Sequence, residues 1–163
     1  MNSVIVSSKC MNWRTPDDLF QVLNNEFNFV LDSAADKYNH KCKNYYTVED
    51  NSLTKSWDFG GSVFCNPPYG KYISKFVEKA FYESMEIPYP IVLLIPARTD
   101  TKWFKNYIFN KAEIRFISGQ LKFISPDGQI LDSAPFPSMV VVYNPYGKVP
   151  KVIFMNYKKG DIK

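Results

Sequence analysis

An unbroken apolar run at residues 91–95, Ile-Val-Leu-Leu-Ile, is the feature that most limits how this chain can fold. A strand with no polar side chain on either face cannot leave one face in water, so the run predicts a central parallel strand covered on both sides. Helices must then lie above and below the sheet. Residues 73–85 come shortly before the run, and their apolar residues recur at steps of three and four, which predicts an amphipathic helix.

The rest of the chain continues this alternation of strands and helices. A helix is expected from the start signal Thr15-Pro16-Asp17-Asp18, with Thr15 as N-cap, to about residue 26. The strand-rich C-terminal third predicts an antiparallel edge, so we expect an α/β sheet with an antiparallel edge in a single domain spanning residues 1–163. The other expected elements are strands at 27–31, 44–47, 63–65, 114–117 and 139–143, a short extended segment at 121–124 and a helix at 100–110.

Composition narrows the class of protein without naming a function. The chain has 20 basic and 16 acidic residues, a mild excess that is compatible with a polyanionic partner. Cys10, Cys42 and Cys65 have no Cys-x-x-Cys spacing, and His40 lies in a polar stretch, so we expect no metal and no disulfide framework. With no long apolar span and no signal-peptide pattern, we expect no membrane association and a cytoplasmic location.

The sequence Asn66-Pro67-Pro68-Tyr69 follows the expected strand at 63–65 and is suited to methylating an amine conjugated to a ring. The side-chain oxygen of Asn66 and the carbonyl of Pro67 can accept both N–H groups of such an amine and aim its lone pair at a methyl donor. Pro68 keeps the loop stiff, and Tyr69 offers a ring on which a base can stack. The alternative is a plain turn after a strand, which is how we interpret Asn144-Pro145-Tyr146, where no amphipathic helix follows.

Acidic and small residues at strand ends predict a cofactor site beside this motif. Ligands of open α/β sheets bind outside the carboxyl ends of the strands, where Asp32, Asp50 and Asn66 are expected to converge. Carboxylates there receive a ribose diol or an ammonium group, and S-adenosylmethionine presents both. The small residues Ser33 and Ala34 would let its backbone approach. Asp32 could instead cap the segment that follows it, and for Asp50 both interpretations stay open.

Several motifs in a fixed order resemble the phage-type, Dam-like DNA N6-adenine methyltransferases over roughly residues 12–143. This resemblance implies a class I S-adenosylmethionine-dependent methyltransferase fold, which is Rossmann-like, and double-stranded DNA as the substrate. The motifs are Trp13-Arg14-Thr15-Pro16, Leu31-Asp32-Ser33-Ala34-Ala35, Asn39-His40-Lys41-Cys42, Leu53 with Trp57, Asn66-Pro67-Pro68-Tyr69, Pro96-Ala97-Arg98-Thr99-Asp100-Thr101 and Gly119-Gln120-Leu121-Lys122-Phe123.

The resemblance also implies roles for individual residues. It places a flipped adenine against Asn66, Pro67, Pro68 and Tyr69, and it places Arg98 and Thr99 beside that loop as substrate contacts. The cofactor pocket would include Trp13, Thr15, Pro16, Asp32, Ser33, Ala34, Asp50 and Asn66. Gln120 stands where the family pattern has arginine, so weaker DNA affinity is expected. Lys122 is expected to contact substrate, and Lys71, Lys75, Lys158 and Lys159 are further candidates for phosphate contacts.

The expected activity is therefore methyl transfer from S-adenosylmethionine to the N6 amine of adenine in DNA, by a monomer with low sequence specificity or with specificity read by residues 118–136. Two alternatives stay open at this stage. The same motif serves enzymes that methylate RNA bases or protein glutamine, and a catalytically silent module that binds DNA or cofactor could keep the fold.

Overall fold

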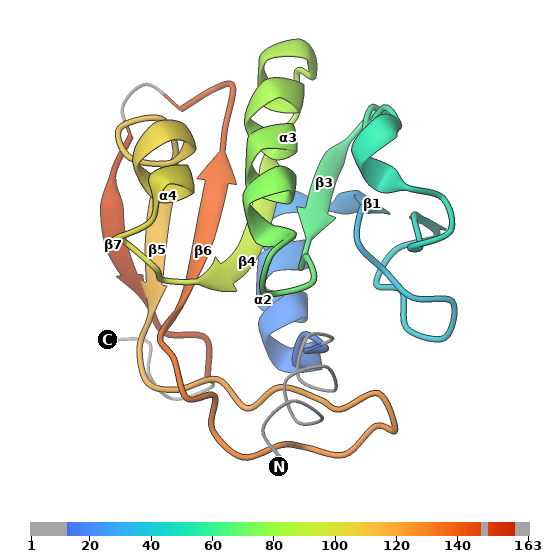
Figure 1. Cartoon of the computed structure of the whole chain (residues 1–163), viewed down its shortest axis with the longest axis vertical. Coiled ribbons are helices and arrows are strands. Elements are labelled where there is room, and N and C mark those ends of the chain that lie inside the picture. Colours follow the sequence, from blue (N-terminus) through green and yellow to red (C-terminus); the bar gives the residue numbers. More distant parts are fainter. Residues whose placement is uncertain (1–12, 148–149, 159–163) are drawn as a thin grey trace.

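The computed structural model describes residues 13–147 and 150–158, and it contains a seven-stranded mixed sheet with the order β2-β1-β3-β4-β6-β5-β7 (Figure 1). The strands are β1 (Phe29–Asp32), β2 (Asn44–Tyr45), β3 (Ser62–Cys65), β4 (Ile91–Pro96), β5 (Glu113–Ile117), β6 (Ser138–Tyr143) and β7 (Val152–Met155). The helices are α2 (Asp17–Phe27), α3 (Ile73–Glu86) and α4 (Lys102–Tyr107), with a 3-10 turn η1 (Ser52–Thr54).

Helices cover both faces of this sheet, as the buried central strand requires. Figure 1 shows α3 and α4 in front of the sheet and α2 behind it. Phe81 of α3 packs against Tyr143 of β6, whereas Phe20 of α2 packs against Phe64 of β3 with ring centroids 5.2 Å apart. All six residues of β4 are buried, so the prediction of a central strand covered on both faces is confirmed. Its expected parallel pairing holds only on one side, because β4 is parallel to β3 and antiparallel to β6.

The expected antiparallel edge is wrong in its position. β6 is antiparallel to both of its neighbours, but it lies inside the sheet between β4 and β5. The edge strand is β7, which runs parallel to β5 and which the pattern analysis did not predict. All six residues of β6 are buried, whereas Val152, Ile153 and Phe154 of β7 are exposed. An unbroken apolar run in the C-terminal third is therefore typical of an interior strand, as it is in β4.

The start of α2 also differs from expectation. Pro16 occupies the N-cap position and no side chain caps the helix. The hydroxyl of Thr15, expected as the cap, accepts a hydrogen bond from Asn66 instead. The Thr15 hydroxyl therefore binds a residue that is distant in the sequence and does not cap the helix. Capping preferences are local and cannot predict such a long-range contact.

The expected extended segment at 121–124 is part of a long connection between β5 and β6. Within it, Ile124 forms isolated bridges to Arg14 and to Ile130. Figure 1 shows this connection running beyond the ends of β5 and β6, on the side where the strands β1, β3 and β4 also end. Of the helices that the structure describes, none has the length and apolar character needed to cross a membrane.

Candidate active site

A cavity of about 440 Å³ opens at the carboxyl ends of β1 and β3. This volume lies in the range of small-molecule sites. The loops after β1 and β3 both contribute to its wall. Asp32 and Asn66 therefore line the same cavity, as expected for residues that follow neighbouring parallel strands. The lining residues are Trp13, Arg14, Thr15, Asp32, Ala34, Ala35, Asp36, Asn39, Lys41, Tyr46, Thr47, Val48, Asn51, Ser52, Leu53, Phe64, Asn66, Pro67, Pro68, Tyr72 and Phe76.

The side-chain amide of Asn66 is held in one orientation by the segment before α2. Its Nδ2 donates to the carbonyl oxygen of Trp13 at 2.5 Å and to Oγ1 of Thr15 at 3.0 Å. Because a carbonyl oxygen can only accept, the NH2 group must face Trp13, and the amide oxygen must face the other way. That oxygen, Oδ1, is buried and has no hydrogen-bond partner among the described residues.

An unpaired acceptor is the chemical consequence of this arrangement. Leaving a buried acceptor unsatisfied costs about 1–3 kcal/mol, so an N–H donor that reaches Oδ1 gains that amount of interaction. Pro67 and Pro68, which follow Asn66 on the cavity wall, have no N–H group of their own to offer. The site can therefore receive a donor-rich group such as an amine. Oδ1 of Asn66 has no contact with solvent. The atoms that cover this oxygen must therefore move when an amine binds to it.

Asp32 places a desolvated carboxyl group on the same cavity. It ends β1, is 4% exposed, and accepts hydrogen bonds from the backbone N–H of Lys41 at 2.9 Å and of Ala34 at 3.4 Å. Burial raises the pKa of Asp32 to about 6, against the opposing effect of these two N–H groups and of the Lys41 charge. The alternative role for Asp32 was to cap the segment that follows it, and its long hydrogen bond from the Ala34 N–H provides such a contact. The Asp32 side chain also lines the cavity, so the two roles are compatible.

Asp50 does not lie on the cavity wall, although Thr47, Val48 and Asn51 of the same loop do. Its carboxylate accepts from the backbone N–H of Thr47 at 2.7 Å and from the Thr47 hydroxyl at 3.0 Å. These bonds lower the pKa of Asp50 and hold its own turn. Asp50 therefore does not join Asp32 and Asn66 on the cavity wall, because the turn holds its carboxylate through Oδ2, and its cofactor role stays a prediction.

Tyr69 is buried and is not among the lining residues. Its hydroxyl donates to the carbonyl of Leu94 at 3.3 Å, and its ring meets the edges of Phe123 and Phe136 at centroid distances of 6.1 and 5.6 Å. Trp13 packs on the same two phenylalanines. A base can stack on Tyr69 only after this aromatic cluster of Trp13, Tyr69, Phe123 and Phe136 opens, so the stacking role stays a prediction.

The remaining predicted residues lie around the cavity or away from it. Pro16 is buried beside Thr15, and Ser33 is buried with its hydroxyl donating to the Phe64 carbonyl at 3.3 Å. Arg98 and Thr99 are exposed just after β4, on the same edge of the sheet as the cavity. Lys122 is exposed on the long connection before β6. Lys158 is exposed, and Lys159 and Cys10 lie outside the described residues.

Sequence reasoning missed several residues of the wall. Arg14 lies inside a motif that was singled out, but only its neighbours were assigned to the pocket. Tyr72 is 39% exposed and lies between two exposed lysines, with Nζ of Lys71 5.1 Å and Nζ of Lys75 5.9 Å from its ring centroid. The spacing from Pro68 to Tyr72 and Phe76, at steps of four, could have shown that the start of the helix turns these rings toward the motif loop.

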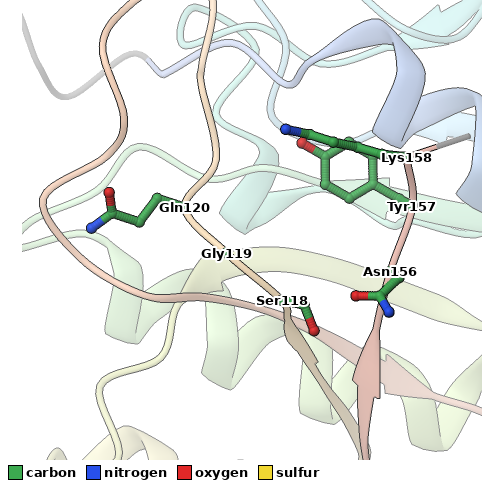
Figure 2. Close-up of a pocket in the computed structure, with 6 residues that line it drawn as sticks. All are labelled: Ser118, Gly119, Gln120, Asn156, Tyr157 and Lys158. Atoms are coloured by element: carbon green, nitrogen blue, oxygen red, sulfur yellow. The ribbon is translucent and has the colours of Figure 1, made fainter. Parts of the chain in front are cut away.

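A second, smaller cavity of about 320 Å³ lies at the carboxyl ends of β5 and β7. Figure 2 shows Ser118 and Asn156 at the ends of these neighbouring strands, with Gln120 on the opposite side of the view from Tyr157 and Lys158. It is lined by Ser118, Gly119, Gln120, Asn156, Tyr157 and Lys158. Gln120 therefore belongs to this polar cavity and not to the wall that carries Asn66.

His40 lies in a loop, as predicted. Its ring stacks on Tyr45 at a centroid distance of 3.9 Å, and its Nδ1 lies 2.9 Å from the carbonyl oxygen of Cys42. Within residues 13–147 and 150–158, no group of three or more His, Cys, Asp or Glu side chains is placed to hold a metal ion.

Comparisons with known proteins agree with the motif order. The family model described as DNA N-6-adenine-methyltransferase (Dam) matches residues 2–163. A DNA N-6-adenine-methyltransferase of Haemophilus phage HP1 (strain HP1c1) is 34% identical over 137 residues, which is 82% of this chain and 78% of the relative. A DNA N-6-adenine-methyltransferase of Escherichia phage T1 is 36% identical over 110 residues, which is 67% of this chain and 45% of the relative.

Proposed function

This chain belongs to the DNA N-6-adenine-methyltransferase (Dam) family, and from that premise we propose that Asn66 is the residue that orients the target amine. Family membership over the whole matched range confirms the expected activity, methylation of adenine in DNA, and the expected enzyme class. Methylation of RNA or protein glutamine and a catalytically silent module are the alternatives that this membership disfavours.

The observation that carries the proposal is the fixed amide of Asn66. Trp13 and Thr15 bind its NH2 group, and the unpaired Oδ1 is the acceptor that remains. The N6 amine of adenine spreads its lone pair into the ring and is a weak nucleophile. Asn66 Oδ1 and the Pro67 carbonyl can accept the two N–H groups of this amine. These hydrogen bonds favour tetrahedral geometry at the nitrogen, so that its lone pair leaves the ring system and points toward the methyl donor.

We propose S-adenosylmethionine as the cofactor, held by the rest of the cavity wall. When bound, it supplies a methyl group on a positively charged sulfur. Asp32 receives its cationic amino group, and the small side chain of Ala34 lets its backbone approach. Trp13 and Thr15 close the side next to Asn66, where Thr15 also holds the amide. Ser33 and Pro16 are buried next to these wall residues and stay candidates for the cofactor pocket. The cavity of about 440 Å³ and its buried carboxyl group support this assignment.

The chain's residues act by placement. Asn66 is neutral and Pro67 has no side-chain base, so they orient the amine without taking up its proton, which leaves to water after transfer. Pro67 and Pro68 keep the loop rigid and offer no competing donor. Exclusion of water by Trp13 and the other rings of the aromatic cluster strengthens each hydrogen bond in the site.

We further propose a class I, Rossmann-like methyltransferase fold for the single domain. The parallel strands β1, β2, β3 and β4, with the cavity outside the carboxyl ends of β1 and β3, support this assignment. Duplex DNA then approaches that same edge, and the flipped adenine enters beside Asn66 at a cost of a few kcal/mol for unstacking. Tyr69, Arg98, Thr99 and Lys122 stay candidates for substrate contact, and the enzyme is proposed to act as a monomer in the cytoplasm.

Methyl transfer from radiolabelled S-adenosylmethionine to separate DNA, RNA and protein substrates tests the assignment. DNA should be labelled at adenine N6, and the rate of labelling should fall strongly for Asn66→Ala while S-adenosylhomocysteine still binds. Asn144→Ala is the matched control, because Asn144 lies in the other Asn-Pro-Tyr sequence and its backbone forms a turn to Gly147 at 3.0 Å. Full activity of Asn66→Ala would refute the role of the amide.

A further inference from the structure

The guanidinium of Arg14 lies on the cavity wall and has more hydrogen-bonding capacity than the protein uses. Its Nη2 donates to Oδ2 of Asp36 at 3.2 Å. Its Nε is buried and has no partner among the residues that the structure describes. An arginine presents several N–H donors in a rigid plane, and a buried donor left unpaired on a charged group is more costly than a neutral one. The arrangement leaves an edge of the guanidinium for a ligand.

The backbone around Arg14 is fixed, whereas its ion pair is weak. The N–H and carbonyl of Arg14 both pair with Ile124 at 3.0 Å, so the chain cannot drift away from the cavity. Asp36 also accepts from the N–H groups of Tyr38 and Asn39, each at 2.8 Å, and its side chain is 45% exposed. An ion pair with such a half-exposed partner contributes little to stability. Arg14 can therefore exchange Asp36 for another carboxylate at little cost.

The same cavity holds a buried acid that complements this cation. Asp32 is 4% exposed, and its two oxygens each accept only one backbone N–H among the described residues. The wall also carries Asp36, which pairs with Arg14, and Lys41, whose ammonium pairs with Asp17. The Asp32 carboxylate and the Arg14 guanidinium together fit a zwitterionic amino acid, whose ammonium pairs with the acid and whose carboxylate pairs with the arginine in a two-pronged contact. Sulfonium cofactors with an amino-acid tail carry this pair of charges.

Resting on the proposed function, we infer that Arg14 binds the α-carboxylate of the methyl donor's amino-acid moiety, opposite the α-ammonium group received by Asp32. Because Nε has no contact with solvent in the free protein, the guanidinium must turn away from Asp36 to present that edge. The loss of one half-exposed ion pair is smaller than the gain from a charge-assisted pair of hydrogen bonds inside the cavity.

Isothermal titration with two adenosine probes tests this inference without an activity readout. S-adenosylhomocysteine carries the amino-acid moiety, whereas 5′-methylthioadenosine lacks it. Arg14→Met should weaken binding of S-adenosylhomocysteine by about 10- to 100-fold and change the affinity for methylthioadenosine by less than about twofold. Lys111→Met is the control, since it removes an exposed cation that does not lie on the cavity wall, and it should change neither affinity.

The other outcomes separate this inference from the proposed function. Equal weakening of both probes, or of neither, overturns the carboxylate contact while leaving the methyl donor in place. A loss of DNA affinity alone makes Arg14 a phosphate contact and likewise overturns it. If the wild-type protein binds neither probe, the proposed cofactor fails and the inference fails with it. Should Arg14→Met not fold, Arg14→Gln, which keeps an N–H donor but no charge, is titrated with the same two probes.

Discussion

Replacement of Asp32 by asparagine should make the unliganded protein more stable and at the same time prevent it from binding the methyl donor. Burial raises the pKa of Asp32 from 3.8 to about 6. One pKa unit corresponds to about 1.36 kcal/mol, so ionised Asp32 lowers the stability of the folded protein by about 3 kcal/mol at pH 8. Asparagine avoids this charge, but its NH2 group cannot accept from Lys41 or Ala34, which removes about 1 kcal/mol of the gain. A net stabilisation of about 1–2 kcal/mol is expected.

The pH dependence of unfolding gives this prediction its sign. A carboxyl group with a raised pKa binds its proton more tightly in the folded state, so its contribution to stability is complete below pH 3.8 and is lost as the pH rises through about 6. Urea unfolding of the wild-type protein should show this loss between pH 4 and 6.5. The free energy of unfolding of Asp32→Asn should lack it, and the two proteins should differ most above pH 7.

Ligand binding should change in the opposite direction. At about 100 times its dissociation constant, S-adenosylhomocysteine should stabilise the wild-type protein by about 2.7 kcal/mol, and Asp32→Asn should show little shift. Asp132→Asn, which changes an exposed carboxylate, is the control and should alter neither measurement. A less stable Asp32→Asn protein with an unchanged pH profile would refute the reasoning, because the buried carboxylate would then be fully compensated by its hydrogen bonds.

Three further predictions concern the motif and its support. Asn66→Ala should lower the rate of DNA methylation by about 10²–10³-fold in single-turnover assays, as expected when one oriented hydrogen-bonding group is removed from the reacting centre. Thr15→Val removes the hydroxyl that accepts from Asn66 at 3.0 Å and should lower the same rate about tenfold, whereas Thr15→Ser should keep it. Gly61→Ala should destabilise the fold by about 1–3 kcal/mol in urea unfolding, because its Cβ would lie 2.6 Å from Cγ1 of Val30; unchanged stability would show that Val30 can move.

Much of the architecture could be predicted because it depends on patterns within single segments. The apolar run of β4 and the amphipathic spacing of α3 set which surfaces must be buried, whatever lies next to them. The Asn-Pro-Pro-Tyr order after a strand likewise indicated the chemistry, because proline geometry and the amide acceptor are local properties. The same reasoning identified Asp32 and Asn66 as neighbours, since parallel strands end at one edge of a sheet.

The tertiary structure alone decided which groups remain available in the site. Thr15 binds Asn66 instead of capping α2, Asp50 is occupied by its own turn, and Tyr69 is enclosed by Phe123 and Phe136. Each outcome depends on competition between a local partner and one that is distant in the sequence, and the winner is set by packing and by the need to satisfy buried polar groups. The amino-acid sequence thus determined the layers of the fold and the motif to which we assign the chemistry. Three-dimensional packing determined that β6 lies inside the sheet, that Asn66 Oδ1 lacks a partner among the described residues, and that Arg14 lies on the cavity wall.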